Sequence, residues 1–148
     1  MYKQEKLFSN DRVILLTLKE EYFDQILNGT KLHEFRFRFP VEDVIAYIYL
    51  PSPIKKVVGK FRLSNTRFLD IKTISDFYHK TYEKPYSEMF DWVTPRKGCY
   101  VSDITDVMAF EKCINYEELI GIKGFSAPQQ YMYLESKLEL LEVLEKLK

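Results

Sequence analysis

The sequence predicts an α+β domain in which five to six strands form a small curled β-barrel, with flanking helices and a helical insertion. Three observations lead to this prediction: apolar runs typical of strands, a glycine inside one of them, and a change to helical patterning over 66–97. A glycine within a strand often marks a bulge, and bulges curl small sheets. With 148 residues, 46% of them hydrophobic, the chain is expected to form a single domain over 1–148.

The first strand is expected over 12–17, followed by a short amphipathic helix. Thr17 and Glu20 have the spacing of a capping box, which predicts the start of that helix. Asn28-Gly29 is expected to end it, because glycine readily adopts the left-handed conformation found there. Lys31 is therefore expected directly after a tight helix-to-strand corner, in a fixed position.

A strand over 31–39 places successive side chains on opposite faces. One face would carry three aromatic residues and the other three charged ones: Phe35, Phe37 and Phe39 against Glu34, Arg36 and Arg38. We expect the aromatic face to be buried and the charged face to line an open surface beside Lys31. Such a surface suits an anionic or highly polar ligand better than a core.

The rest of the chain follows the same logic of apolar runs and breakers. Further strands are expected over 44–50, 55–64 and 98–111, and Gly59 suggests a bulge or a close backbone approach. The insertion at about 66–97 should contain helices near 72–80 and 86–92, and a helical turn is expected over 116–120. A C-terminal helix is predicted over 136–147, opened by a capping-box spacing between Ser136 and Glu139.

Net charge is zero, so no global field favours nucleic acid or membrane, but the basic residues are unevenly placed. Segment 31–67 holds eight lysines and arginines against three acidic residues, which predicts an anion-binding surface there. Cys99 and Cys113, in apolar surroundings and without a CxxC spacing, are expected to be buried thiols. No apolar run approaches the roughly 18 residues of a membrane span, so we expect a cytoplasmic protein without membrane contact.

Familiar catalytic and cofactor motifs are absent from the sequence: it has no GxSxG, P-loop, GxGxxG or HExxH. Two histidines and two separated cysteines do not give a familiar zinc spacing. We therefore predict no metal and no cofactor. His33 shares the phenylalanine face, where a partly buried structural histidine is expected.

Gly29, Lys31, Glu34 and Arg36 spell GxKxxExR directly after the first helix. With the order of elements, this motif resembles the ASCH domain, a family of the PUA-like superfamily. The resemblance spans roughly residues 12–134 and includes the Tyr49–Lys60 segment, the Gly98–Phe110 segment and the late loop from Gly124. It implies a PUA-like curled barrel with a cleft lined by the motif residues.

The resemblance also implies a function. Relatives are proposed to bind RNA, and a few are ribonucleases or amidohydrolases that deacylate a modified cytidine. In the amidohydrolases the motif lysine is catalytic and a threonine three residues later is taken as the nucleophile. Glu34 stands at that threonine position here, which argues against the same deacylase chemistry and leaves a cleft built on Lys31 intact.

Seven residues are candidates for contacts with RNA or another ligand: Lys31, Glu34, Arg36, Arg38, Tyr47, Ser126 and Gln129. Lys31 has the chemistry to donate to a phosphate or base carbonyl, or to act as a base in an enzyme. Glu34 and Arg36 are close enough to pair and simply hold each other. Tyr47 could stack a base, although core packing is the commoner role of such a tyrosine.

Three functional hypotheses remain open from the sequence. The first is a domain that binds RNA or a nucleotide-like ligand around Lys31, Glu34 and Arg36. The second is a small hydrolase, a ribonuclease or a modified-nucleoside amidohydrolase, that uses Lys31 in the same cleft. The third is a protein-interaction module that uses the 66–97 insertion and the C-terminal helix.

Overall fold

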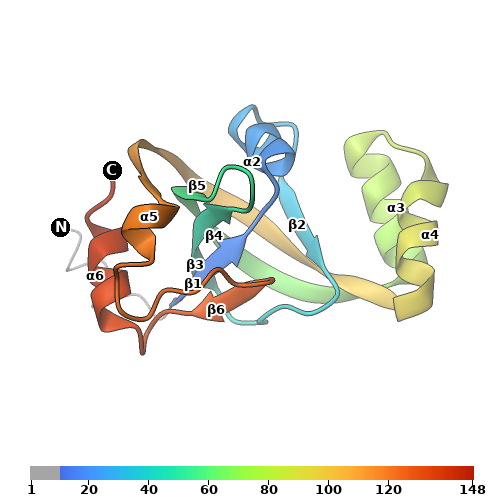
Figure 1. Ribbon diagram of the computed structural model, residues 1–148. Helices are drawn as coiled ribbons and strands as arrows, with labels where there is room; N and C mark the ends of the chain where they lie inside the picture. Colours follow the sequence, from blue (N-terminus) through green and yellow to red (C-terminus); the bar gives the residue numbers. More distant parts are fainter. Residues whose placement is uncertain (1–10) are drawn as a thin grey trace.

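The computed structural model describes residues 11–148, which form a six-stranded mixed sheet and five α-helices (Figure 1). The strands are β1 (Arg12–Thr17), β2 (His33–Arg36), β3 (Val44–Leu50), β4 (Lys56–Asp70), β5 (Gly98–Asn115) and β6 (Tyr131–Tyr133). The helices are α2 (Glu20–Leu27), α3 (Ile71–Tyr82), α4 (Tyr86–Val93), α5 (Tyr116–Leu119) and α6 (Leu138–Glu145), with a 3-10 turn η1 (Thr94–Arg96).

The sheet is strongly curled but does not close within the described residues. Its strand order is β2-β5-β4-β3-β1-β6, with β1 and β3 parallel and the other pairs antiparallel, so β2 and β6 remain at opposite edges. The β4–β5 register shifts at three places, and each shift adds to the bend. The predicted α+β fold is confirmed, with an open curled sheet in place of a closed barrel.

Gly59 lies at one of these irregularities, as its position inside a strand predicts. A side chain at this position would place its Cβ 2.4 Å from the carbonyl oxygen of Met108 on β5 and 2.8 Å from the ring of Phe23 on α2. Glycine therefore allows β4 to approach both neighbours closely.

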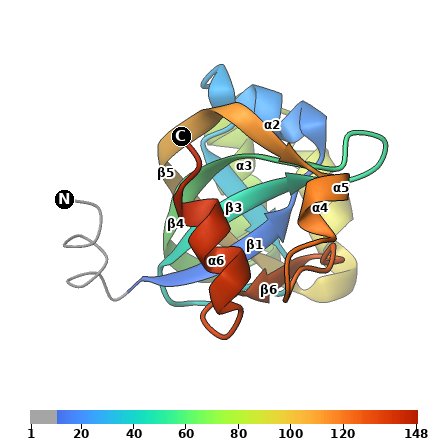
Figure 2. The ribbon, with the colours of Figure 1, turned by 60° about the vertical axis from the view of Figure 1, so that its left-hand side comes forward.

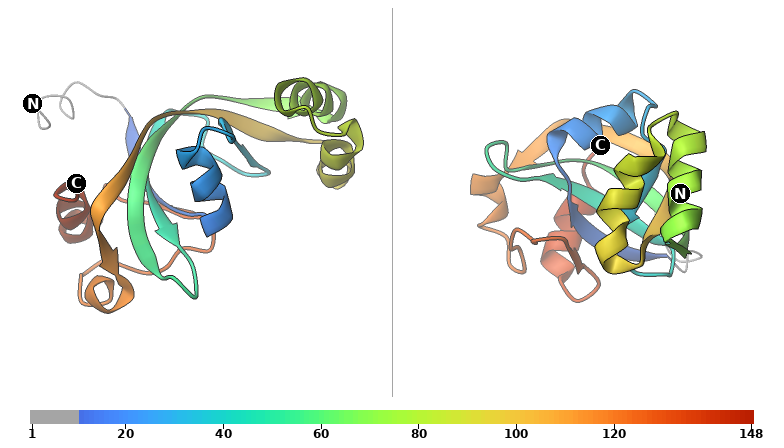
Figure 3. Two further views of the ribbon diagram at one scale, coloured as in Figure 1. Left: turned by 90° about the horizontal axis from the view of Figure 1, so that it is seen from above. Right: turned by 90° about the vertical axis from the view of Figure 1, so that its right-hand side faces the viewer.

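Apolar side chains form cores on both faces of the sheet. On the concave face lies α2 (Figure 3). Its Phe23 and Ile26 pack against β1, β3 and β4. On the opposite face, α6 lies across the sheet (Figure 2). It contributes Leu140 and Leu144 to the second core. Tyr47 belongs to this second core, and alternation along β3 sends Ala46 to the first.

The long strands β4 and β5 extend beyond the curled part and carry α3 and α4 at their far end (Figure 3). The two helices pack side by side around Ile74, Met89 and Val93, which meet Cys99 and Val101 of β5. Asp70 is the N-cap of α3, and its carboxylate accepts a hydrogen bond from the Thr73 amide. A two-helix arm therefore stands opposite β2 and α2, across the concave face.

The strands predicted over 12–17 and 44–50 are confirmed to the residue. The insertion predicted over 66–97 is helical only from Ile71, because residues 66–70 continue β4, and 67–70 pair with β5. β5 likewise runs to Asn115, beyond its predicted end. The added parts of β4 and β5 carry polar and charged residues because one side of these strands faces solvent.

Both predicted capping boxes are wrong. Lys19 and Lys137 occupy the N-cap positions of α2 and α6, and neither makes a side-chain cap. Thr17 ends β1 instead, and α6 spans 138–145 within the predicted 136–147. The cysteine prediction is half right, since Cys99 is buried but Cys113 is exposed.

Candidate functional site

The corner after α2 places Lys31 as the sequence predicts. The helix ends at Asn28, and Gly29 has a φ of 82°, which lets the chain reverse. The amides of Thr30 and Lys31 then both donate to the Gln25 carbonyl, at 2.9 and 3.1 Å. These bonds fix the backbone of Lys31 at the entrance to β2.

Lys31, just before β2, forms a charged group with Glu34 and Arg36 of that strand. Lys31 Nζ lies 3.4 Å from one oxygen of the Glu34 carboxylate, and Arg36 Nε lies 2.7 Å from the other. The Glu34 side chain is only 5% exposed, so the prediction that it lines an open surface is wrong. Burial is possible because one cation pairs with each carboxylate oxygen.

Arg36 also connects this group to β1 and the late loop. Its Nη2 donates to the Thr17 carbonyl at 3.0 Å, while the Thr17 hydroxyl donates to the Pro128 carbonyl at 2.6 Å. The Thr17 amide in turn donates to the Gln130 carbonyl. The charged group is therefore held by three segments that are distant in sequence.

A cleft of about 940 Å³ opens above the charged group, between α2 and β2 on one side and the α3–α4 arm on the other. Its charged residues are Lys19, Lys31, Glu34, Arg36, Lys84 and Glu88, and its aromatic residues are Tyr22, Phe35, Tyr78, Tyr82 and Trp92. The cleft therefore combines a charged floor with aromatic walls.

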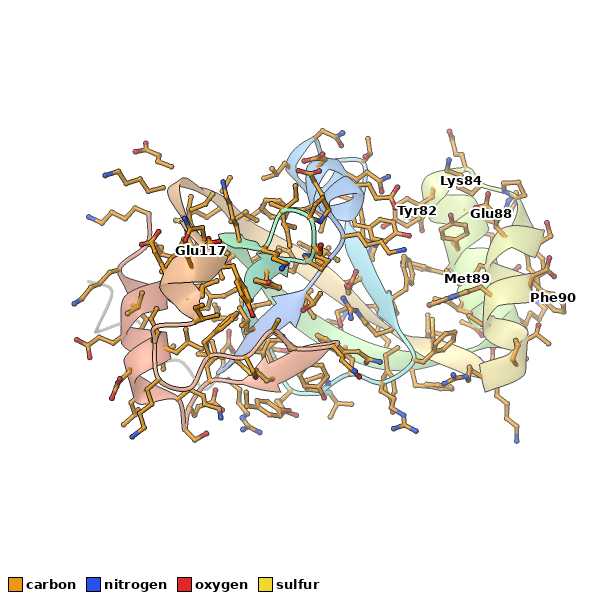
Figure 4. The ribbon with its side chains drawn as sticks, in the orientation of Figure 1. Tyr82, Lys84, Glu88, Met89, Phe90 and Glu117 are labelled. Carbon is orange, nitrogen blue, oxygen red and sulfur yellow. The ribbon has the colours of Figure 1, made fainter. Side chains whose placement is uncertain are left out.

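The arm presents Tyr82, Lys84, Glu88 and Met89 toward this cleft, whereas Phe90 lies on the far side of α4 (Figure 4). Tyr78 donates its hydroxyl proton to Glu88 at 2.8 Å. Burial and this carboxylate raise the pKa of Tyr78 to about 12, and burial also raises the pKa of Tyr82. Both phenols therefore remain neutral hydrogen-bonding groups at physiological pH.

Tyr82 also links the arm to β2. Its hydroxyl accepts from the Leu32 amide at 3.1 Å and lies 2.7 Å from His33 Nδ1. His33 packs edge-on against Phe77, and burial lowers its pKa despite the opposing effect of Asp103, 3.6 Å away. His33 is thus the partly buried structural histidine that the sequence predicts.

The structure brings four of the seven predicted site residues together. Lys31, Glu34, Arg36 and Gln129 line the cleft. Arg38 lies in a smaller pocket that adjoins it. Tyr47 is only 1% exposed, in the core on the opposite face, so its predicted stacking role is wrong.

Ser126 also lies outside the cleft lining. Ser126 is on the loop that precedes β6, and its hydroxyl lies 3.7 Å from the sulfur of Met132 in that strand.

The three phenylalanines predicted on one face do not share a face: Phe35 and Phe37 pack toward the arm, while Phe39 enters the core beside α2. The strand ends at Arg36, so alternation does not continue to residue 39.

The arm supplies cleft residues that the sequence did not identify, above all Tyr78, Tyr82 and Trp92. The available signal was the density of aromatic residues over 77–92, on two helices joined by a short loop. Their direction depends on how the arm stands relative to β2, which no local pattern reveals.

The basic segment 31–67 does not form one surface. Arg62 pairs with Asp11 and Asp43, Arg67 pairs with Asp103, and Lys55 lies over the Tyr116 ring at the other end of the sheet. Of the eight basic residues in this segment, only Lys31, Arg36 and Arg38 line the cleft or its adjoining pocket.

Metal-binding clusters and membrane-spanning helices are both absent from residues 11–148. No group of three or more His, Cys, Asp or Glu side chains among them is arranged to hold a metal ion. None of the helices described there has the length and apolar character needed to cross a membrane.

Comparison with solved structures gives the fold its class. The crystal structure of ASCH from Zymomonas mobilis superposes with a TM-score of 0.74 at 22% identity, over 93% of this chain and 96% of that chain. A serine-to-alanine variant of that protein gives 0.75 at 22% identity, over 94% and 99%, and a tyrosine-to-phenylalanine variant gives 0.74 at 21%, over 93% and 99%. No family model and no curated protein matches the sequence.

The chain therefore has the ASCH fold, as the resemblance implied, over nearly its whole length.

Proposed function

We propose that this protein binds single-stranded RNA, or a nucleotide-like ligand, in the cleft between β2 and the α3–α4 arm. The observation that supports this most directly is the charged group of Lys31, Glu34 and Arg36 on the floor of an aromatic-walled cleft. A base needs a flat apolar surface for its ring and hydrogen-bonding groups for its edge. The cleft offers both.

The aromatic walls suit an unstacked base. The cleft volume, about 940 Å³, lies at the upper end of the range typical of small-molecule sites, roughly 300–1,000 Å³. Trp92 is partly exposed at the wall and packs on Phe37 with ring centroids 4.2 Å apart. An indole held in this way is a suitable platform for a base.

The charged floor suits the polar edge of the same ligand. Lys31 Nζ has three donor positions and only one acidic partner among the described residues, Glu34. Glu34 in turn keeps Lys31 and Arg36 in place, since each of its oxygens faces one cation. In this proposal Lys31 contacts the ligand and Glu34 positions it.

The net charge of zero sets the expected character of binding. Without a broad basic surface, long-range attraction to phosphates is weak, and affinity for arbitrary RNA is low. Selectivity then depends on the base that enters the cleft. This favours single strands or loops over duplexes.

The hydrolase alternative uses the same cleft with Lys31 as the catalytic residue. Both oxygens of Glu34, which takes the place of the threonine nucleophile, face cations. This arrangement favours a positioning role over nucleophilic attack. An assay that detects cleavage as well as binding separates the two functions.

The test is the fluorescence anisotropy of labelled single-stranded RNA, followed over time and across a salt series. We expect a stable signal with the wild type and a strong loss with Lys31→Ala. Lys123→Ala, which removes an exposed lysine outside the cleft, should bind like the wild type. A signal that decays with the wild type but not with Lys31→Ala would indicate a ribonuclease, and no signal from any variant at low salt would rule out RNA binding.

A further inference from the structure

A second pocket, of about 400 Å³, adjoins the cleft at the end of β2. The two cavities share Phe35, Arg36 and Trp92 in their linings, so they form one continuous depression. We call the second cavity the arginine pocket, because Arg36, Arg38 and Arg96 line it.

The arginine pocket differs from the cleft in its charge. None of the residues that line it is acidic, whereas Glu34 and Glu88 line the cleft. Arg38 and Arg96 are exposed, and neither has a carboxylate partner among residues 11–148. Two guanidinium groups are therefore available to a ligand there, each with several donors in a planar fork.

Contacts within the protein already hold two of the three arginines of the pocket in place. The guanidinium carbon of Arg96 lies 4.9 Å from the centre of the Phe37 ring, and Trp92 packs on the same ring. Arg36 is held by Glu34 and the Thr17 carbonyl. Two of the three arginines thus have restricted positions before any ligand arrives, which lowers the entropy cost of binding.

We propose that the arginine pocket binds a phosphate group attached to the nucleoside whose base occupies the cleft. This inference rests on the proposed function and adds to it the chemical class of ligand: a nucleotide or an RNA strand, in preference to a free nucleoside. Arginine forks match the oxygens of a phosphate, and Trp92, which lines both cavities, stands where base and phosphate would join.

The distribution of acidic groups supports the same division. A phosphate placed in the cleft would approach the carboxylates of Glu34 and Glu88, whereas the lining of the arginine pocket has three arginines and no carboxylate. The neutral base and the anionic phosphate of one nucleotide are therefore directed to different cavities.

The experiment is isothermal titration calorimetry with uridine and cytidine, with their 5′- and 3′-monophosphates, and with inorganic phosphate. The variants are Arg38→Gln/Arg96→Gln and a matched control, Lys80→Gln/Lys97→Gln. The control removes two exposed charges from the arm or its base that line neither cavity. Thermal unfolding verifies that both double variants remain folded.

We expect at least one monophosphate to bind the wild type roughly 10- to 100-fold more tightly than its nucleoside. The arginine variant should lose that preference while nucleoside affinity stays unchanged, and the lysine control should keep it. Equal binding of nucleoside and nucleotide to the wild type, or a preference that survives in the arginine variant, would overturn the phosphate assignment alone. Absence of binding by every nucleoside and nucleotide would refute the phosphate assignment and, if RNA also fails to bind, the proposed function.

Discussion

Arg36 donates a hydrogen bond of 2.7 Å from Nε to Oε2 of Glu34, which lies two residues earlier on β2. Both side chains are largely buried. The other carboxylate oxygen faces Lys31 Nζ at 3.4 Å. Glu34 therefore neutralises part of the charge of two cations that would otherwise repel each other. The Glu34–Arg36 pair therefore fixes side chains on the floor of the cleft, on a strand at the edge of the sheet.

Substitution Glu34→Ala should lower the free energy of unfolding by about 3 kcal/mol, because it leaves two poorly exposed cations without their carboxylate. Glu142→Ala is the control: its pair with Lys146 is exposed, so the loss should stay below about 0.5 kcal/mol. Urea denaturation of both variants measures the difference. Similar losses from the two substitutions would show that Glu34 is not a structural centre of the site.

Gly59→Ala should destabilise the fold by about 1–3 kcal/mol, because the new methyl group would press on the β5 backbone and on Phe23. Gly121→Ala provides the comparison, since its nearest neighbour would be 3.5 Å away, an ordinary contact. Thermal unfolding is the measurement. An unchanged melting temperature for Gly59→Ala would mean that the sheet bends without this close approach.

The pH dependence of stability should depend in part on His33. Its pKa in the folded protein is lowered by burial, so the folded state takes up a proton less readily than the unfolded chain. The contribution of His33 is therefore complete above the unfolded pKa of about 6.5 and declines as the pH falls below it.

Urea denaturation at about pH 7.5 and pH 5.5 tests this expectation. The wild type should lose more stability between these values than His33→Asn, which does not titrate. Identical pH profiles for wild type and His33→Asn would contradict the role given to burial.

Trp92→Ala should weaken RNA binding by roughly tenfold or more, because it removes the platform for a base. Phe90→Ala, in the same helix but on the side away from the cleft, should leave binding unchanged (Figure 4). Anisotropy with a short labelled RNA measures both. Equal effects of the two substitutions would place the ligand elsewhere.

The sequence predicted the elements whose signals are local. Apolar runs defined β1 and β3 because both strands are buried on their two faces. The corner at Gly29 was predictable because a left-handed residue after a helix strongly favours glycine. The motif of Lys31, Glu34 and Arg36 also predicted the cleft floor, because its signal is local. All three residues lie within β2 or the corner directly before it.

What the sequence did not predict depends on tertiary contacts. Glu34 is buried because two cations reach it, an outcome that alternation alone cannot distinguish from an open charged face. Tyr47 faces away from the cleft because β3 presents its tyrosines to the core under α6. The contribution of Trp92 depends on where β4 and β5 carry the arm, and the register between these two strands shifts at three places that no local pattern reveals.

The most direct test of the cleft uses Trp92 itself, since it is the single tryptophan of the chain and lines both cavities. Its fluorescence would be followed during titration with unlabelled single-stranded RNA hexamers, for the wild type and for Lys31→Ala. The account predicts a saturable change in the wild type, weakened by salt and strongly reduced by Lys31→Ala. An unchanged spectrum at low salt, with RNA bound by another measure or not at all, would contradict it.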